Sequence, residues 1–239
     1  MLKERLELYF QREDHARKRD YFFVSEVAKC PRQIFYTAHG FPRPPLDGQT
    51  ARRLAVGEAA HQRILQALYG LGVVVAAEAP IPPNPLFHGR ADAIVSLDGR
   101  NYVVEIKTAH PYSFEQMAVA PRQDHHLQLQ LYLHYLDIPQ GIILAENKAN
   151  QEFKEFAVAR DDRQVAQVLA SFSHLKDLIF GRRCLPPLPD KVEWAFDQCR
   201  YCPYSEFCEQ NVVQPPGAVQ PPPGPAGEAV SPRLFDDWS

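Results

Sequence analysis

Three charged side chains lie within two apolar runs between residues 89 and 107, and they constrain the fold more than any other feature. The runs flank Asp98-Gly99, a pair that favours a tight two-residue turn, so the segment predicts a β-hairpin. Asp92 falls in the first strand, and Glu105 and Lys107 share one face of the second because side chains alternate along a strand. Charges are seldom buried unless they are paired or bind a metal.

The residues alone leave two interpretations of these charges open. One is a structural ion pair between a carboxylate and Lys107, since such pairs also occur in buried strands. The other is a divalent-cation site, because carboxylates from neighbouring strands supply the oxygen ligands that hard cations prefer. A lysine beside them would then orient a water molecule or offset phosphate charge.

Length and composition favour one α/β domain with appendages. The 239 residues suffice for a substantial core, and a net charge of −3 gives no global basic signal for nucleic acid. A local groove of lysine and arginine is nevertheless enough to contact phosphates. We find no apolar run of membrane-spanning length and no signal peptide, so we expect a cytoplasmic protein. Five cysteines in such a chain indicate metal binding or catalysis rather than disulfides.

Hydrophobic periodicity predicts the remaining elements. Helices are expected at 2–19, after an N-cap at Ser25, and at 50–69, 113–120, 123–137 and 161–181. Strands are expected at 72–79, 141–146 and 153–158. From Val212 the chain turns to Pro, Gly and Ala, which predicts a disordered tail. The tail ends in an acidic, aromatic tip at 234–239, which is either a docking peptide or inert.

Three motifs in a fixed order resemble the PD-(D/E)XK nucleases of the RecB-like branch. They are Gly89-Arg90-x-Asp92, then Glu105-Ile106-Lys107, then Gln128-x-x-x-Tyr132 on one helix face. The resemblance implies a restriction-endonuclease-like core, with a mixed central sheet flanked by helices and an N-terminal helical lobe. It also implies catalytic roles for the matching side chains, namely Asp92, Glu105, Lys107, Gln128 and Tyr132.

The resemblance further implies a set of metal ligands. By itself His61 reads as an ordinary half-buried helix histidine. In the family, however, a Gly-x-x-x-His helix before the first core strand often supplies a ligand, and Gly57 to His61 matches that pattern. The implied site holds Mg²⁺ or Mn²⁺ through His61, Asp92, Glu105 and the backbone carbonyl of Ile106. For Glu78 the residues leave two interpretations, another acidic group near the site or a surface residue at the end of a strand, and the second is preferred.

Cys199, Cys202 and Cys208 form a C-x2-C-x5-C pattern in which the short spacer lets two thiols face one metal centre. Either Cys30 or Cys184 supplies the fourth ligand, and sequence chemistry alone favours a zinc site. The layout resembles that of AddB-type nucleases and of the CRISPR-associated RecB-like exonucleases, the fourth Cas family. That resemblance implies a [4Fe-4S] cluster held by Cys30 and the three C-terminal cysteines, with Cys184 as a free thiol.

The resemblance implies a metal-dependent DNA exonuclease that acts on single-stranded ends. Residues 1–211 would form the nuclease with its iron–sulfur cluster, and residues 212–239 the proline-rich tail. The resemblance extends to trimming of CRISPR prespacers beside an integrase complex, in antiviral defence. The alternative is a phage or host recombination and repair nuclease with its own recombination partner. A non-catalytic DNA-end-binding module and a redox sensor built on the cluster belong to other classes. The intact Asp92, Glu105 and Lys107 favour the enzyme over the binding module.

Overall fold

The computed structural model describes residues 1–12, 18–188 and 199–216, and the chain divides into two compact units. The first unit combines three stretches of the chain: Met1–Arg12, Phe22–Ala28 and Leu46–Leu169. The second unit takes Lys29–Pro45 and the described parts of Glu13–Tyr21 and Ala170–Ser239. No helix in the described part of the chain is both long enough and apolar enough to cross a membrane.

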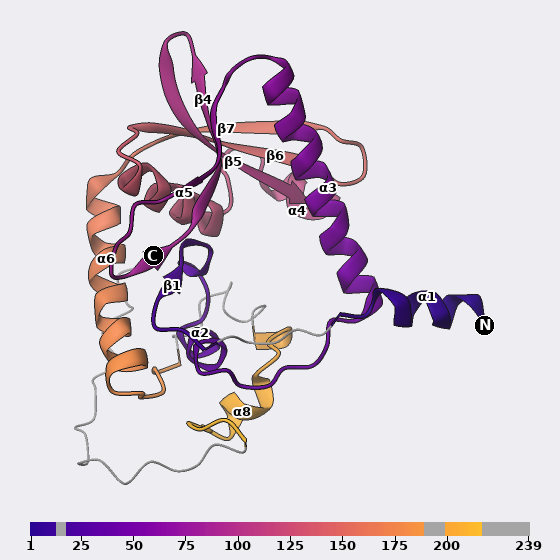
Figure 1. Cartoon of the computed structure of the whole chain (residues 1–239), viewed down its shortest axis with the longest axis vertical. Helices are drawn as coiled ribbons and strands as arrows, with labels where there is room; N and C mark the ends of the chain where they lie inside the picture. The colour runs from indigo at the N-terminus through magenta and orange to yellow at the C-terminus, as the bar shows by residue number, and fades with distance from the viewer. Residues whose placement is uncertain (13–17, 189–198, 217–239) are drawn as a thin grey trace. The chain divides into compact units, whose positions relative to one another are not determined.

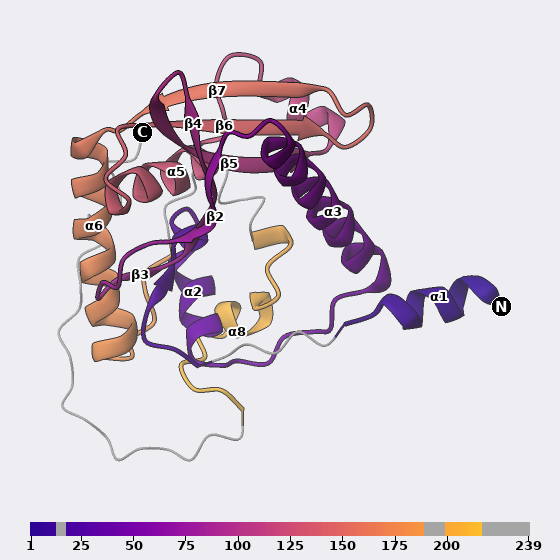
Figure 2. The ribbon, with the colours of Figure 1, turned by 45° about the horizontal axis from the view of Figure 1, so that its top comes forward.

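The first unit is built on a five-stranded mixed sheet with the strand order β2-β4-β5-β6-β7 (Figures 1 and 2). The strands are β2 (Val74–Pro80), β4 (Arg90–Leu97), β5 (Arg100–Ala109), β6 (Gln140–Asn147) and β7 (Phe153–Ala159). Strands β5 and β6 run parallel, and the other neighbours are antiparallel. This mixed sheet flanked by helices confirms the predicted α/β, restriction-endonuclease-like fold.

The predicted hairpin is formed by β4 and β5. Its two turn residues, Asp98 and Gly99, have φ values of 49° and 74°. Both therefore lie in the left-handed region that a primed hairpin turn requires, and glycine enters this region without steric cost. The register runs from Leu97 paired with Arg100 towards the other end of the strands.

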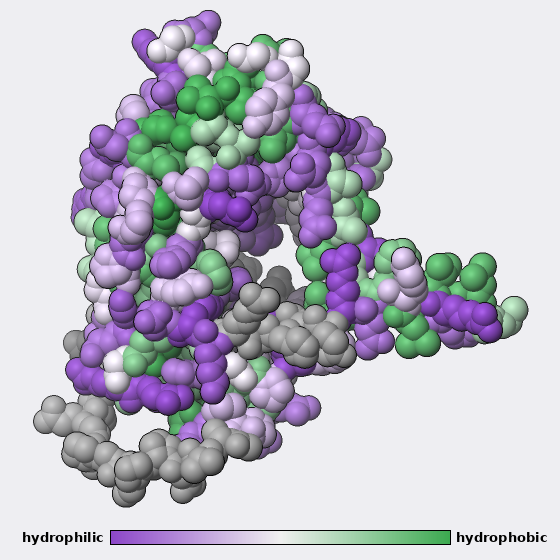
Figure 3. Space-filling model, in the orientation of Figure 1, coloured by the Kyte–Doolittle hydropathy of each residue, from purple (hydrophilic) through white to green (hydrophobic). Residues whose placement is uncertain are grey.

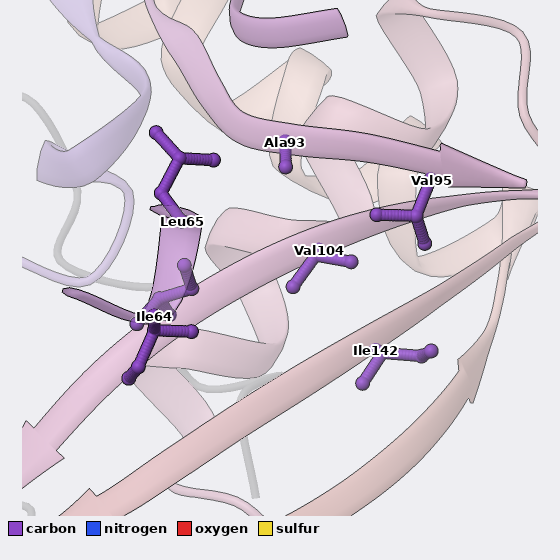
Figure 4. Close-up of a cluster of buried hydrophobic side chains, with 7 residues drawn as sticks. Ile64, Leu65, Ala93, Val95, Val104 and Ile142 are labelled. Atoms are coloured by element: carbon purple, nitrogen blue, oxygen red, sulfur yellow. The ribbon is translucent and has the colours of Figure 1, made fainter. Parts of the chain in front are cut away.

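Buried side chains of α3 (Gly48–Gly70) cover one face of the sheet (Figure 4). The cluster joins helix residues to residues of three strands: Ile64, Leu65, Ala93, Val95, Val104, Ile106 and Ile142. Burial of such aliphatic side chains stabilises the layer by roughly 1.5–3 kcal/mol for each fully buried residue. The structure thus confirms the helix predicted at 50–69.

The opposite face carries α4 (Pro111–Gln116) and α5 (Gln123–Tyr135). Phe114 of α4 packs against Ala145, which points away from the α3 face because side chains alternate along β6. Gly141 allows α5 to approach, since an added Cβ would lie 2.9 Å from Leu129 Cδ1. Because Glu105 and Lys107 are two residues apart, β5 presents both on one face, as predicted.

The helix predicted at 2–19 is wrong beyond residue 10. Helix α1 spans Leu2–Phe10, and Gln11 adopts an extended backbone at φ −60° and ψ 134°. Arg12 then forms a bridge with Leu46, and residues 13–17 lie outside the described residues. The apolar side chains of α1 remain exposed, at 72% for Leu2 and 69% for Leu8 (Figure 3). The apolar spacing therefore predicted the start of the helix correctly but not its end, and no residue on its apolar side is buried.

The helix predicted after an N-cap at Ser25 is also wrong. Residues Val24–Glu26 form a single 3₁₀ turn, η1, which follows the short strand β1 (Phe22–Phe23). Strand β1 pairs in parallel with β3 (Phe87–His88). Helix α2 instead spans Pro31–Ala38. Its start at Pro31 is favourable, because proline at the first helical position has no amide to leave unsatisfied.

The second unit has an aromatic core. The ring centroids of Tyr36 and Phe41 lie 4.8 Å apart, and those of Phe41 and Phe207 lie 5.2 Å apart. Phe207 belongs to α8 (Ser205–Glu209).

The helix predicted at 161–181 is α6 (Asp162–Lys176), continued by the π-helical turn η2 (Asp177–Gly181). Most of the predicted proline-rich tail, from residue 217 to the tip at 234–239, lies outside the described residues.

Candidate metal and catalytic site

Asp92 is held in place where the pairing of β4 and β5 stops. The paired register ends at Ala93 and Val104. Beyond it, the Ile106 amide donates to Asp92 Oδ2 at 2.7 Å, so a side chain takes the position of a backbone acceptor. Burial raises the pKa of Asp92, while the Ile106 amide and His61 act against that rise. The hydrogen bond on Oδ2 leaves Oδ1 to face the neighbouring side chains.

Three potential metal ligands come together around Asp92. His61, Glu78 and Asp92 each offer one ligand atom, and these atoms all lie within 4.8 Å of one another. His61 Nε2 is 3.8 Å from Glu78 Oε1 and 3.9 Å from Asp92 Oδ1. Among the described residues, His61 Nε2 is buried without a hydrogen-bond partner. A buried imidazole nitrogen facing two carboxylate oxygens fits a divalent cation, because all three atoms are electron-pair donors.

Glu78 belongs to this group, which agrees with the less favoured of the two interpretations of this residue from the sequence. In the register of β2 and β4 it lies opposite Asp92, between the pairs Ala77–Ala93 and Ala79–Ala91. Its φ of 49° lies in the left-handed region, where non-glycine residues are uncommon and where the backbone costs roughly 1–2 kcal/mol. Such outliers gather at functional sites. The one signal in the sequence was an acidic residue at the end of the strand before the hairpin.

Glu105 is the most deeply buried of the predicted catalytic residues, at 1% exposure. Its Oε1 lies 2.5 Å from Lys107 Nζ, while its Oε2 has no hydrogen-bond partner among the described residues. Burial raises the pKa of Glu105 to about 7, because the favourable Lys107 charge only partly offsets the loss of water and Asp92 adds repulsion. The ion pair expected from the residues is therefore present beside the three-ligand group. The unpartnered Oε2 makes Glu105 a candidate further ligand.

Lys107 connects this pair to α5. Burial alone would lower its pKa, but the carboxylates of Glu105 and Asp92 raise it, so the side chain stays cationic. Lys107 Nζ donates to Gln128 Oε1 at 3.3 Å. Burial raises the pKa of Tyr132, and Glu105 adds to the rise, while hydrogen bonds with Gln128 and the Arg90 backbone oppose it. The structure thus brings both residues of the predicted helix motif to the site.

A steric requirement explains the glycine at position 89 of the Gly-Arg-x-Asp motif. A Cβ at this position would lie 2.8 Å from Val24 Cγ2 and 3.2 Å from Tyr132 Cε1. The chain can therefore pass between η1 and α5 only without a side chain at residue 89. The glycine places Arg90 and Asp92 next to Tyr132.

A cavity of about 360 Å³ adjoins the site. Its lining includes His61, Ile106 and Lys107, together with the basic side chains of Arg53 and Lys148. Lysine and arginine contact phosphate oxygens whatever the base sequence. The cavity can therefore accept the backbone of a nucleic acid next to the candidate ligands.

In the second unit, Cys30 and Cys202 each lie close enough to Cys199 and Cys208 for these thiols to affect their pKa. Burial raises the pKa of Cys30, and Cys208 and Cys199 raise it further. Cys202 behaves similarly, since burial and then the other three thiols raise its pKa. Cys184 is exposed and lies 3.7 Å from a backbone oxygen of its own turn. The structure thus groups Cys30, and not Cys184, with the three C-terminal cysteines.

The described thiols do not surround a single ion. Within the described residues, the group of three or more ligands that meets the distances for one ion is that of His61, Glu78 and Asp92. Cys30, Cys202 and Cys208 lie near enough to Tyr36 to raise its pKa, and together with Cys199 they match the number of ligands of an iron–sulfur cluster or of a four-cysteine zinc site. The structure does not itself show such a cluster.

Comparison with known proteins places this chain in a family. A crystal structure of SSO0001 has a TM-score of 0.52 and 21% identity, over 88% of this chain and 95% of that chain. LHK-Exo, an alkaline exonuclease from Laribacter hongkongensis, has a TM-score of 0.53 and 13% identity in its complex with dAMP, over 68% and 89% of the two chains. Both likenesses show the fold, and no curated protein matches the sequence. The family model of the PD-(D/E)XK nuclease superfamily matches residues 72–209, more than half of the chain, so this chain belongs to the PD-(D/E)XK nuclease superfamily.

Proposed function

We propose that this nuclease is a metal-dependent DNA exonuclease that hydrolyses phosphodiester bonds at single-stranded ends. The observation that carries the proposal is the group of His61, Glu78 and Asp92 beside the buried Glu105–Lys107 pair. These are the side-chain types that cation-assisted hydrolysis of a phosphodiester requires. The exonuclease LHK-Exo, which has the same fold, binds dAMP, and this supports DNA as the substrate class.

His61, Glu78 and Asp92 would hold Mg²⁺ or Mn²⁺, with Glu105 and the carbonyl of Ile106 as further ligands. The bound cation would polarise the scissile phosphate and make a water molecule more acidic. Within the chain, the Ile106 amide fixes the orientation of Asp92, and burial keeps Glu105 in one position.

Lys107 offsets the charge that develops on the phosphate oxygens and orients the attacking water. Its charge persists at neutral pH, because Glu105 and Asp92 raise its pKa. Gln128 accepts a hydrogen bond from Lys107 Nζ and so limits where the ammonium can lie. Tyr132 stays protonated and acts as a positioning residue beside Gln128. Preorganised charge of this kind stabilises the transition state more than the bound substrate.

We further propose that Cys30, Cys199, Cys202 and Cys208 hold a [4Fe-4S] cluster in the second unit, and that residues 1–211 form the nuclease and residues 212–239 a tail. The effect of the neighbouring thiols on the pKa of Cys30 and Cys202 supports the proposal. The resemblance in cysteine layout favours a role in CRISPR prespacer trimming beside an integrase; a phage or host recombination and repair nuclease is the second candidate.

Iron analysis of anaerobically purified protein tests the cluster. Cys30→Ala should lose iron and Cys184→Ala should keep it, and equal iron contents would reject the assignment.

A nuclease assay tests the main proposal. End-labelled linear single-stranded and double-stranded DNA would be incubated with Mg²⁺, Mn²⁺ or EDTA, and circular single-stranded DNA would serve to detect internal cleavage. Cleavage should need the cation and a free end, and Asp92→Asn and Lys107→Met should abolish it. Asp162→Asn changes an exposed aspartate of α6 and should cleave as the wild type does. Cleavage by both site variants would reject the site, and cleavage of circles would reject an exonuclease.

A further inference from the structure

A second cavity, of about 570 Å³, adjoins the site on the side of Glu78 and Tyr132. Both residues line this cavity, so it is continuous with the group that we assign to the cation and to the helix motif. Its volume falls within the range of about 300–1,000 Å³ that is typical of small-molecule pockets. All the residues that line it belong to the first unit.

Most of the side chains that line this cavity are apolar, and several of them contain rings. It includes Phe23, Phe87 and the prolines Pro80, Pro82 and Pro83. Phe23 is 41% exposed, whereas Phe87 is buried at 1% exposure, so Phe23 is the aromatic side chain that this wall presents. Nucleic-acid bases stack on aromatic side chains, whatever the base.

The cavity also has a positively charged side chain next to the proposed metal ligand Glu78. Arg90 lines it, is 66% exposed and lies 3.6 Å from Glu78 through its Nε. A guanidinium in this position can contact a phosphate while its neighbour Glu78 faces the cation group. The same cavity thus offers a nucleotide a surface for its base and a charge for its phosphate.

We propose that this cavity, the base pocket, binds the unpaired base of a nucleotide adjacent to the scissile phosphate of single-stranded DNA. The inference rests on the proposed function and gives its preference for single-stranded ends a structural basis. A base in a duplex is already stacked and paired, so it would have to leave the helix to enter, at a cost of a few kcal/mol. A base at a single-stranded end has no such cost.

The base pocket is fixed by local structure. Strands β1 and β3 pair Phe22 with Phe87 and Phe23 with His88. The amide of Phe23 donates to Glu26 Oε2 at 3.0 Å, which holds the residue at the start of η1. Asn84 closes the proline-rich segment, since its side chain bonds the backbone of Pro82, Leu86 and Phe87. A preformed pocket loses little conformational freedom when it binds a base.

Binding of fluorescent DNA tests the base pocket without cleavage. Single-stranded oligonucleotides with 2-aminopurine at successive positions would be bound to the Lys107→Met protein in Ca²⁺. One position near the end should show quenching through Phe23. Phe23→Ala should remove that quenching and weaken binding about 5- to 150-fold, the range that one base–aromatic stack contributes. Phe23→Trp should retain both, which separates loss of the ring from loss of folding.

Two controls make the outcome specific. Phe153→Ala removes a phenylalanine of β7 that is 50% exposed and lies outside the base pocket, and it should bind like the parent. An abasic nucleotide at the quenched position should weaken binding to the parent, with no further loss in Phe23→Ala. Independent losses from the two changes, or equal binding by Phe23→Ala and Phe153→Ala, would overturn the proposal. A wild type that binds in this way without cleaving DNA would refute the proposed function and leave the base pocket standing.

Discussion

The buried Glu105 predicts that cation binding releases a proton near neutral pH. Burial raises the pKa of this carboxyl group to about 7, so below that pH most molecules carry a proton on Glu105. A carboxylate ligand must lose its proton before it binds a cation. Protonation and cation binding therefore compete, and the affinity for the cation should rise with pH until Glu105 is ionised.

The size of the effect follows from the pKa. For one group with a pKa of about 7, the protonated fraction is about 0.9 at pH 6 and about 0.1 at pH 8. The apparent dissociation constant for the cation should thus fall about tenfold over this range, which corresponds to about 1.4 kcal/mol of binding free energy. The buried Asp92 also has a raised pKa, so its proton release acts in the same direction.

Titration calorimetry with Mn²⁺ isolates the contribution of Glu105. Measurements in buffers of different ionisation enthalpy give the number of protons released, for the wild type and for Glu105→Gln. The difference between the two proteins should be about 0.9 proton at pH 6 and about 0.1 at pH 8. An equal release by both proteins at pH 6 would refute the reasoning, as would a difference that persists unchanged at pH 8.

Three further changes test other parts of the site. Gly89→Ala should destabilise the protein by about 1–3 kcal/mol, because the new Cβ would lie 2.8 Å from a side-chain carbon of η1. Gly70→Ala, where nothing lies within 4 Å, should leave the melting temperature unchanged or higher. Glu78→Gln should weaken Mn²⁺ binding about tenfold or more in calorimetry without lowering the melting temperature of the metal-free protein. Arg53→Ala combined with Lys148→Ala should reduce the slope of log affinity against log salt by about 1.4 for single-stranded DNA, as two lost phosphate contacts require.

Local patterns predicted most of the sheet but not every helix end. The hairpin was predictable because the turn pair Asp98-Gly99 and the alternation of its strands act within a few residues. The helix predicted at 2–19 failed at its end because Arg12 pairs with Leu46, a contact far along the chain. The helix after Ser25 failed because Pro31 offered a better start five residues later, after a single turn.

The site itself was predictable only in part, for a related reason. Asp92, Glu105 and Lys107 were recognisable because charges within apolar strands are unusual, and this needs no tertiary information. The assignment of His61 depended on resemblance, since a helix histidine by itself carries no signal. Their roles as ligands and catalytic groups remain proposals, whereas their positions around Asp92 are described by the structure.

Glu78 could not be placed from the sequence, because its position depends on the register of β2. Residues 72–79 are almost continuously apolar, so no alternation shows which side chains face the site. The register of β2 against β4 shifts between Val74 and Ala76, and only the shifted register puts Glu78 opposite Asp92. A slip of one residue would turn Glu78 to the other face of the sheet. Because Glu78 lines both the cation group and the base pocket, this irregularity in β2 determines whether the two can share a wall.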